Sequence, residues 1–185
     1  MAQKHNYNFQ HRDATMNYQL AMLAGACLLA PCTFATTPTR GRSSPHQVTG
    51  NELTANDAGL DAQFGPVRIA QNNITGNTRG IDFTDGGSPT PSAPLVVRNN
   101  VFGIKAYGVE VFQATAGGLP KLRENNIYGN GLCGTHNGTS EALDARNNFW
   151  GAATGPSDTD PADNACSALV PTRTSPFATS EFAVH

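Results

Sequence analysis

The sequence has little charge and no apolar run long enough to cross a membrane. Of its 185 residues, 14% are Asp, Glu, Lys or Arg, and the formal net charge is −2. Without an excess of basic residues the chain offers no surface for nucleic acid, so we expect no nucleic-acid partner. Its main apolar stretch, Leu20 to Ala30, is too short to span a bilayer. Membrane contact is therefore expected only if this N-terminal segment is retained.

The N-terminal region differs from the rest of the chain. Within residues 1–35, the apolar stretch follows Lys4 and Arg12 and precedes small residues, a pattern typical of a secretory signal peptide. A capping helix that packs on the following domain is the alternative, and a disordered or non-native leader is a third. Residues 36–46 are rich in Thr, Ser and Pro and are expected to be a linker.

Cysteine is scarce, with four residues in the whole chain. Cys27 and Cys32 lie in the N-terminal region, and Cys133 and Cys166 lie toward the other end. If the leader is removed, an even pair remains, and a Cys133–Cys166 disulfide then suits an oxidising compartment. Two free, buried thiols are the alternative. We expect a secreted or cell-surface protein.

Asparagine, in contrast, is abundant and recurs at regular intervals. Segments beginning NNIT, NNVF, NNIY and NNFW, with a looser NELT, follow the pattern apolar-x-x-Asn-x-apolar at spacings of 21 to 27 residues. The fifth copy departs from the pattern because Asp144 occupies its leading apolar position. The first asparagines of the copies are Asn51, Asn72, Asn99, Asn125 and Asn147.

A second block, Gly-apolar-acid-apolar, follows the asparagine in three copies. It reads GLDA from Gly59, GIDF from Gly80 and GVEV from Gly108. The fourth copy has only GTHN from Gly134, so the block is expected to lapse there.

Units of about 22 residues, built from short period-2 runs between Gly and Asn, predict the coils of a parallel β-helix. A leucine-rich repeat needs a leucine ladder that this chain lacks. Helical repeats need a 3.6-residue period, which Gly and Asn at these densities oppose. We expect the helix to occupy residues 47–156 and a turn-rich tail to occupy residues 157–185.

Equivalent residues of successive coils in such a solenoid stack about 4.8 Å apart. We expect the repeated asparagines to occupy tight bends, because asparagine tolerates the left-handed backbone conformation. Their side-chain amides can also bond from coil to coil. The predicted ladder consists of Asn51, Asn72, Asn99, Asn125 and Asn147.

Two segments, Val67–Phe83 and Pro120–Gly131, resemble coils of the right-handed parallel β-helix repeat of the pectate-lyase-like superfamily. The segment Ala145–Asp158 resembles the NNxWG…GP ending of secreted bacterial members. The resemblance implies an all-β fold, a right-handed parallel β-helix of about five coils, and a short or C-terminal portion of such a protein. It does not fix the function, because this scaffold hosts lyases, hydrolases, epimerases and adhesins.

By the same resemblance, the Gly-apolar-acid-apolar blocks form the first sheet, whose outer face often carries the polysaccharide cleft. Alternation along a strand sends Asp61, Asp82 and Glu110 outward, so they should form one acidic column. His136 is expected near the foot of this column, and Arg79 near Asp82.

An acidic column of this kind can bind Ca²⁺ through oxygen ligands, supply an acid and a base for glycoside cleavage, or hydrogen-bond to sugar hydroxyls. Plain solvated surface is the alternative. Ca²⁺ is the one cofactor that the sequence leaves room for, and no metal site is defined. The candidate carbohydrate contacts are Asp61, Asp82, Glu110 and Arg79, and the candidate catalytic residues are Asp61, Asp82, Glu110 and His136.

We expect a carbohydrate-binding or structural β-helix protein, with polysaccharide as its partner. The lyase and polygalacturonase signatures of the superfamily, clustered Asp pairs with a Gly-His or an Arg-x-Pro-x-x-Arg run, are absent. A polysaccharide lyase or glycoside hydrolase, or a remnant of one, stays an alternative, and so does a segment of an adhesin. Whether the chain is an enzyme stays open.

Overall fold

The computed structural model describes residues 46–63, 67–84, 93–112, 118–159 and 163–184. The expected signal peptide or capping helix and nearly all of the expected linker lie outside these residues. The described part of the chain forms thirteen strands and no helix. Accordingly, none of its segments is a helix long and apolar enough to cross a membrane.

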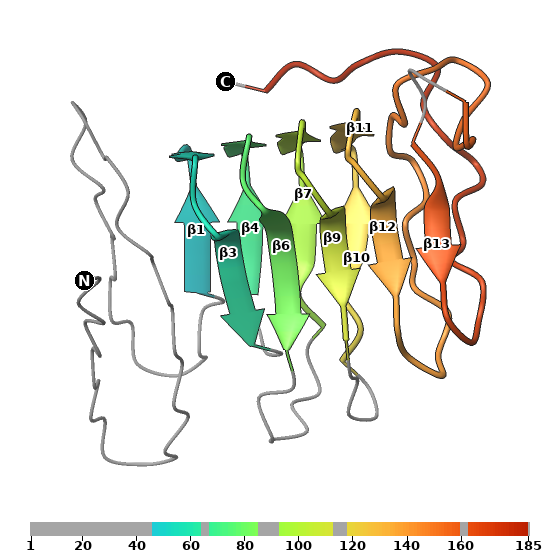
Figure 1. Ribbon diagram of the computed structural model, residues 1–185, viewed down its shortest axis with the longest axis horizontal. Coiled ribbons are helices and arrows are strands. Elements are labelled where there is room, and N and C mark those ends of the chain that lie inside the picture. The colour runs from blue at the N-terminus through green and yellow to red at the C-terminus, as the bar shows by residue number, and fades with distance from the viewer. Residues whose placement is uncertain (1–45, 64–66, 85–92, 113–117, 160–162, 185) are drawn as a thin grey trace, which may run out of the picture.

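The strands form three parallel sheets, here called A, B and C (Figure 1). Sheet A contains β1 (His46–Thr49), β4 (Val67–Ala70), β7 (Leu95–Val97) and β10 (Lys121–Arg123). Sheet B contains β2 (Glu52–Thr54), β5 (Asn73–Thr75), β8 (Asn100–Phe102) and β11 (Asn126–Tyr128). Sheet C contains β3 (Ala58–Gln63), β6 (Arg79–Thr84), β9 (Tyr107–Val111), β12 (Cys133–Asn137) and β13 (Ala165–Ser167).

The chain visits the sheets in the order A, B, C in each of four coils, so each strand pairs with its equivalent in the next coil. The register is that of the sequence repeat, with Val48 opposite Ile69 and Ile69 opposite Val96. This arrangement confirms the predicted parallel β-helix.

The core is a stack of apolar side chains that point inward from all three sheets. Equivalent positions stay apolar from coil to coil because each inward side chain rests on its counterpart in the neighbouring coil. Toward the C-terminal end polar residues replace them, and Thr135 and Asn137 are fully buried at inward positions of β12. The block expected to lapse at the GTHN from Gly134 therefore continues as a strand of sheet C, with polar inward residues.

The ladder of asparagines lies at the bend between sheets A and B. The backbone amide and Nδ2 of Asn72 donate to Oδ1 of Asn99 at 3.0 and 2.9 Å, and Asn99 bonds to Asn125 in the same way. Each Nδ2 also donates to a strand carbonyl of the coil before, such as that of Val48 for Asn72. Fully buried polar groups are thus satisfied at every coil.

Two details of the predicted ladder are wrong. Its fifth member is Asn148, whose Oδ1 accepts from the backbone amide and Nδ2 of Asn125 at 2.9 Å, while Asn147 lies exposed on the surface. The left-handed residue is the one before each ladder asparagine, with φ of 57° at Gln71, 53° at Glu124 and 58° at Asn147. The ladder asparagines themselves need their side chains inside the bend, and the preceding residue makes the turn.

The shift by one residue has a physical reason. With Asn148 in the ladder, Ala145 takes the leading apolar position and Trp150 takes the inward position after the bend, and both are fully buried. With Asn147 there, Asp144 and Phe149 would point inward, because a slip of one residue exchanges the faces of a strand. The segment NNFW contains two adjacent asparagines, and the core selects the second.

A second ladder, absent from the predictions, lies at the bend between sheets B and C. Oδ1 of Asn77 accepts from the amide of Asn56 at 2.8 Å, and Oδ1 of Asn130 accepts from the amide of Ile104 at 3.1 Å. Asp163 ends the series by accepting from the amide of Asn130. The sequence signal was the Gly-Asn pair that ends both NNITGN and NNIYGN.

Glycine at the second position of the first four strands of sheet C, from β3 to β12, is required by the stacking. A Cβ built on Gly80 would lie 2.0 Å from the carbonyl oxygen of Gly108 in the next coil. No side chain fits there, which explains why the repeated block begins with glycine.

The C-terminal segment closes the last coil. It contributes β13 to sheet C, and Arg173 forms a parallel bridge with Asp144, so the expected tail is partly built into the solenoid. The chain then turns back across the coils (Figure 1), and the amide of Phe182 donates to Oδ1 of Asn126 at 2.8 Å.

Candidate functional site on the outer face of sheet C

One file of residues runs along the outer face of sheet C at the position after the inward apolar residue. The strand register places Asp61 opposite Asp82, Asp82 opposite Glu110, and Glu110 opposite His136. The structure therefore brings the four candidate catalytic residues into one row, here called the acidic row. Cys166 occupies the next place in register after His136.

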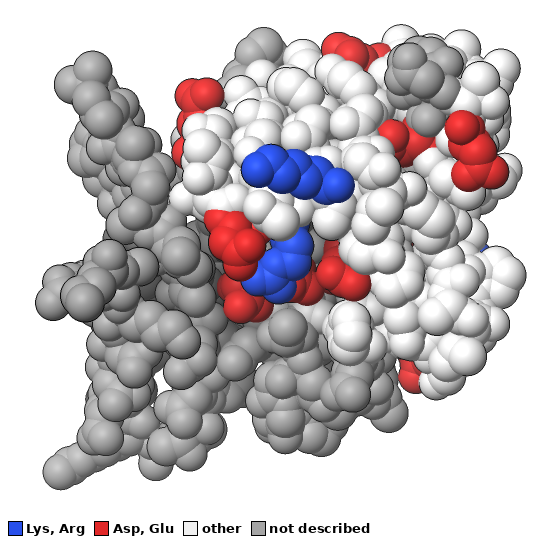
Figure 2. Space-filling view, in the orientation of Figure 1, with Lys and Arg blue, Asp and Glu red and all other residues white. Residues whose placement is uncertain are grey.

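Arg79 lies beside the acidic row, three residues before Asp82 on β6. Its guanidinium forms an ion pair with Asp82 and a second one, at 3.1 Å, with Asp57 at the start of the preceding coil's sheet C segment. Figure 2 shows this patch as acidic side chains around a basic one, over β3, β6 and β9. The cation thus holds two carboxylates of neighbouring coils together.

Burial is the largest influence on the pKa of Asp82, which is only 3% exposed. Burial raises the pKa of its carboxyl, Arg79 opposes this, and the charges of Glu110 and Asp61 add to it. Burial alone would lower the pKa of Arg79, but its hydrogen bond to Asp57 and the charge of Asp82 outweigh that effect and raise it. Asp82 is placed to hold Arg79 more than to reach a ligand.

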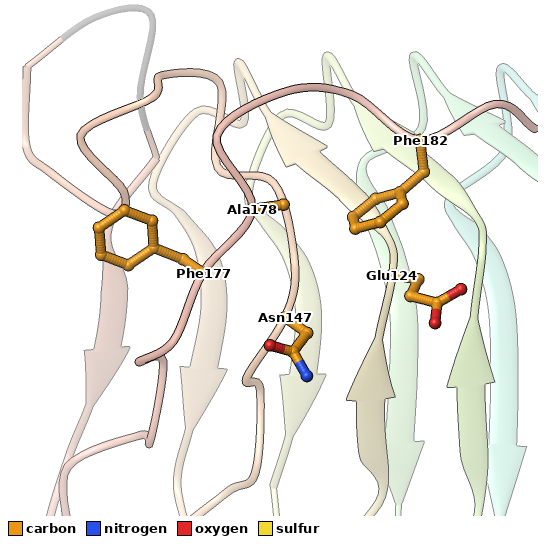
Figure 3. Close-up of a pocket in the computed structure, with 5 residues that line it drawn as sticks. All are labelled: Glu124, Asn147, Phe177, Ala178 and Phe182. Atoms are coloured by element: carbon orange, nitrogen blue, oxygen red, sulfur yellow. The ribbon is translucent and has the colours of Figure 1, made fainter.

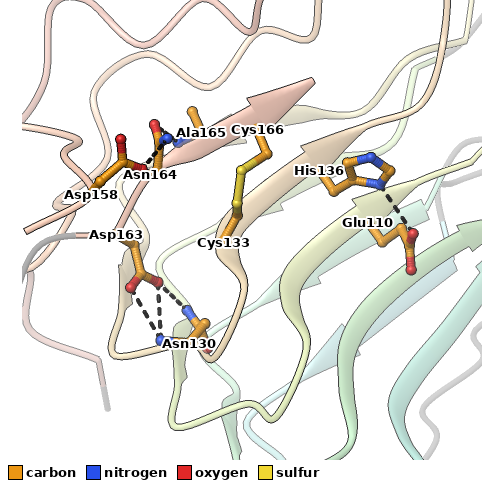
Figure 4. Close-up of a disulfide and its surroundings, with 9 residues drawn as sticks. All are labelled: Glu110, Asn130, Cys133, His136, Asp158, Asp163, Asn164, Ala165 and Cys166. Atoms are coloured by element: carbon orange, nitrogen blue, oxygen red, sulfur yellow. Dashed lines mark hydrogen bonds and ion pairs between the residues drawn. A yellow bond between two sulfur atoms is a disulfide. The ribbon is translucent and has the colours of Figure 1, made fainter. Parts of the chain in front are cut away.

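Glu110 and His136 form the second pair of the row. Nδ1 of His136 lies 3.1 Å from Oε1 of Glu110, and both side chains are about four-fifths or more buried (Figure 4). The ring of Tyr107 stacks on the imidazole, with centroids 4.4 Å apart and planes 15° apart. The imidazole is thus fixed between a carboxylate and an aromatic ring.

The disulfide between Cys133 and Cys166 closes the row at its C-terminal end (Figure 4). It joins β12 to β13, and it confirms the pairing expected from the cysteine count. The row therefore ends against a covalent link between the last two strands of sheet C.

The face presents carboxylate oxygens, a guanidinium, an imidazole and an aromatic ring at successive coils. Such groups can hydrogen-bond to hydroxyls and pack against the apolar face of a sugar ring. Among the residues that the structure describes, no three His, Cys, Asp or Glu side chains are grouped so that they could hold a metal ion.

The sequence identified Asp61, Asp82, Glu110, Arg79 and His136, and the structure brings all five to this face. It missed Asp57 and Tyr107. Tyr107 precedes Gly108 as Arg79 precedes Gly80, so the alignment of glycines would have found it. The segments that follow β6 and β9 in the sequence, within 84–94 and after Phe112, lie almost wholly outside the described residues.

Trp150 plays no part in this face. It is fully buried in the core. The ladder asparagines lie at a different bend and make structural contacts.

Comparison with known proteins agrees with the architecture. Residues 25–150, well over half of the chain, match the sequence model of a family described as the right handed beta helix region. Neither the curated proteins nor the solved structures include a match. The three stacked parallel sheets and this match together show that the chain belongs to the right-handed β-helix family.

Proposed function

We propose that this protein is secreted or displayed at the cell surface and binds a polysaccharide along the outer face of sheet C. The acidic row, with Arg79 and Tyr107 beside it, is the observation that carries the proposal. Its groups recur at every coil, about 4.8 Å apart, which suits a linear polymer lying along the solenoid axis. The disulfide supports an oxidising compartment.

The charge of the face selects the kind of polymer. Asp57, Asp61, Asp82 and Glu110 are carboxylates, and the guanidinium of Arg79 forms ion pairs with Asp57 and Asp82. An excess of negative charge repels polyuronates, because like charges across an interface are unfavourable. The ligand is therefore a neutral or amine-bearing polysaccharide.

Each side chain has a role in this proposal. Glu110 accepts hydrogen bonds from sugar hydroxyls, and His136 and Tyr107 offer ring surface next to it. Arg79, whose side chain is 39% exposed, donates to ring or hydroxyl oxygens while Asp82 holds it in place. The buried carboxylate thus positions the residue that contacts the ligand.

The test is a polysaccharide array probed with and without added Ca²⁺, followed by calorimetric titration of the hits. The wild-type protein should bind neutral or amino-sugar polymers and not polyuronates. Glu110→Gln should weaken binding about tenfold, since a hydrogen bond to a charged group is lost. Glu52→Gln, an exposed acid on β2 of sheet B, is the matched control and should bind normally. Equal binding by both variants, or no binding to any polymer, overturns the proposal.

Glycoside cleavage is the second candidate, and one observation favours it. Asp82 and Glu110 are in register on adjacent strands, and burial raises the pKa of Asp82, as a general acid requires. If the protein releases reducing ends from a neutral polymer and Asp82→Asn abolishes that release, the function is catalysis and not binding alone. Binding without any release leaves the first proposal in place.

A further inference from the structure

A small hollow lies at the bend between sheets A and B, on the opposite side of the solenoid path from the acidic row. Its volume is about 290 Å³, and its lining consists of Glu124, Asn147, Phe177, Ala178 and Phe182 (Figure 3). The C-terminal segment supplies the last three residues and forms one wall. This hollow is here called the tail pocket.

The polar wall of the tail pocket comes from the left-handed residues of successive coils. Glu124 and Asn147 have φ of 53° and 58°, and the amide of Glu124 donates to the carbonyl of Asn147 at 2.8 Å. Since the ladder residues after them point inward, these two side chains face outward. Within the described residues the carboxamide of Asn147 makes no hydrogen bond, so it is available to a ligand.

The apolar wall is fixed by contacts of its own. The ring of Phe177 lies so close to Gly155 that a Cβ there would come within 2.5 Å of it. The neighbouring backbone is anchored because the amide of Ala178 donates to the carbonyl of Asn148 at 3.0 Å. Phe182 is held by two hydrogen bonds between its backbone and the carboxamide of Asn126, at 2.8 and 2.9 Å. The ring of Phe177 and the backbone of Phe182 are therefore placed by the fold before any ligand binds.

The charges around the tail pocket exclude two classes of ligand. Nε of Arg98 donates to Oε2 of Glu124 at 2.7 Å, so the carboxylate is already neutralised and has little need of a cation. An anion would find no basic residue in the lining with which to form an ion pair. What remains is a neutral ligand with hydroxyl groups on one side and an apolar face on the other.

We propose that the tail pocket binds one neutral sugar ring. Its C–H face packs on the ring of Phe182, while vicinal hydroxyls donate to Glu124 and accept from Asn147. The volume lies at the lower limit of small-molecule pockets, which suits a single ring and not an oligosaccharide. The site is separate from the outer face of sheet C and does not depend on the function proposed for that face.

The test is an amide NMR titration of the full chain with methyl glycosides of glucose, galactose, mannose and N-acetylglucosamine. At least one should shift the amides of Glu124, Asn147 and residues 177–182 with a dissociation constant of about 1–10 mM. Sodium glucuronate and tetramethylammonium chloride serve as anionic and cationic probes and should cause no saturable shift.

Asn147→Gly removes the carboxamide and keeps a residue that favours positive φ, so the fold is retained. It should weaken binding at least about fivefold, because a directed hydrogen bond is lost. Gln71→Gly is the matched control, because Gln71 has a similar positive φ to Asn147 but lies at the A–B bend of an earlier coil. This variant should bind like the wild type. Phe182→Ala should weaken binding similarly by removing one ring.

Three outcomes overturn the proposal. The first is that no methyl glycoside shifts these amides at concentrations up to about 50 mM. The second is that the shifts persist unchanged in Asn147→Gly and Phe182→Ala. The third is that tetramethylammonium binds in place of the sugars. Glu110→Gln leaves the tail pocket intact, so failure on the face of sheet C and failure here are distinguished.

Discussion

At the first bend of each coil, one carboxamide satisfies groups from three coils. Oδ1 of Asn99 accepts from the backbone and side-chain nitrogens of Asn72, while its Nδ2 donates to the carbonyl of Ile69 and to Asn125. All of these groups are shielded from water. The contribution of Asn99 to the free energy of unfolding therefore comes mainly from the buried partners that would be left without a hydrogen bond if it were removed.

Asn99→Ala is expected to lower the free energy of unfolding by about 3–5 kcal/mol, because several buried groups lose their partner at once. Asn73→Ala is the matched control, since Asn73 is exposed and should cost less than about 0.5 kcal/mol. Urea unfolding followed by circular dichroism measures both. If Asn99→Ala lowered the free energy of unfolding by less than about 1 kcal/mol, water would have to take over the hydrogen bonds of the missing carboxamide.

Gly80→Ala is expected to prevent folding or to cost more than about 3 kcal/mol, because the added methyl group would overlap the backbone of β9. Gly138→Ala is the comparison, since a Cβ there would meet the carbonyl of Val111 at 3.2 Å and only a small shift is needed. The melting temperatures of the two variants measure the difference. Equal melting temperatures would contradict the close stacking of sheet C.

At the scale of the element, the segment around Asp144, which follows the fourth coil, is held to that coil partly by charge. Asp144 forms ion pairs with Arg123 of β10 and, at 2.9 Å, with Arg146. The hydrogen bond from Arg146, with that from Arg123, holds the pKa of Asp144 well below its ordinary value, although burial opposes this. The folded state therefore favours the ionised carboxylate.

A carboxyl with a lowered folded pKa stabilises the fold above its unfolded value and loses that contribution as the pH falls. Asp144→Asn should therefore cost about 1 kcal/mol at neutral pH, a value that allows for partial exposure. The cost should shrink below a pH of about 4, where the unfolded carboxyl takes up its proton. Chemical unfolding of both proteins across this range measures the difference, and a pH-independent cost would assign the effect to packing.

The repeat made the strands and the acidic row predictable from sequence. Period-2 alternation and the spacing of Asn72 and Asn99 fix which residues share a face, so Asp82 and Glu110 had to lie in one file. The fifth coil was misplaced by one residue because asparagine alone cannot distinguish Asn147 from Asn148. The burial of Trp150 settles the register, and side-chain volume in the core was the missing constraint.

The tail pocket could not be predicted, because it depends on contacts between remote segments. Phe182 forms a hydrogen bond with Asn126, which is 56 residues away in the sequence, and the repeat gives no indication of that contact. The stack of Tyr107 on His136 similarly depends on side-chain directions across adjacent coils. The sequence repeat therefore specifies the solenoid, whereas single long-range contacts specify the tail pocket and the side-chain stack on the outer face.

At the scale of the molecule, the disulfide ties the last strand of sheet C to the rest of the solenoid. Cys133 and Cys166 are 33 residues apart, so the bond limits the freedom of a long loop in the unfolded chain. The double variant Cys133→Ala/Cys166→Ala is expected to lose about 3–4 kcal/mol of unfolding free energy on the loop-entropy estimate. Guanidinium unfolding of the variant and of the oxidised protein checks this value.

The strand pairing of β13 should survive in that double variant, because the carbonyl of Asn137 accepts from the amide of Ala168 at 3.0 Å and Asp163 still bonds to Asn130. Hydrogen exchange at the amides of β13 should then accelerate without reaching the rate of an unfolded chain. Full exposure of these amides would mean that the covalent bond alone holds the strand.

The spacing between ladder asparagines is uneven, at 21, 27, 26 and 23 residues. The distance from each of the first four asparagines to its partner in the acidic row stays at ten or eleven residues, as between Asn72 and Asp82 or Asn125 and His136. The extra length therefore enters at one corner, after sheet C and before the next strand of sheet A. A foreign peptide grafted at that corner would be displayed in multiple copies beside the outer face of sheet C without altering the cross-section of the solenoid, which makes the fold a natural presentation scaffold.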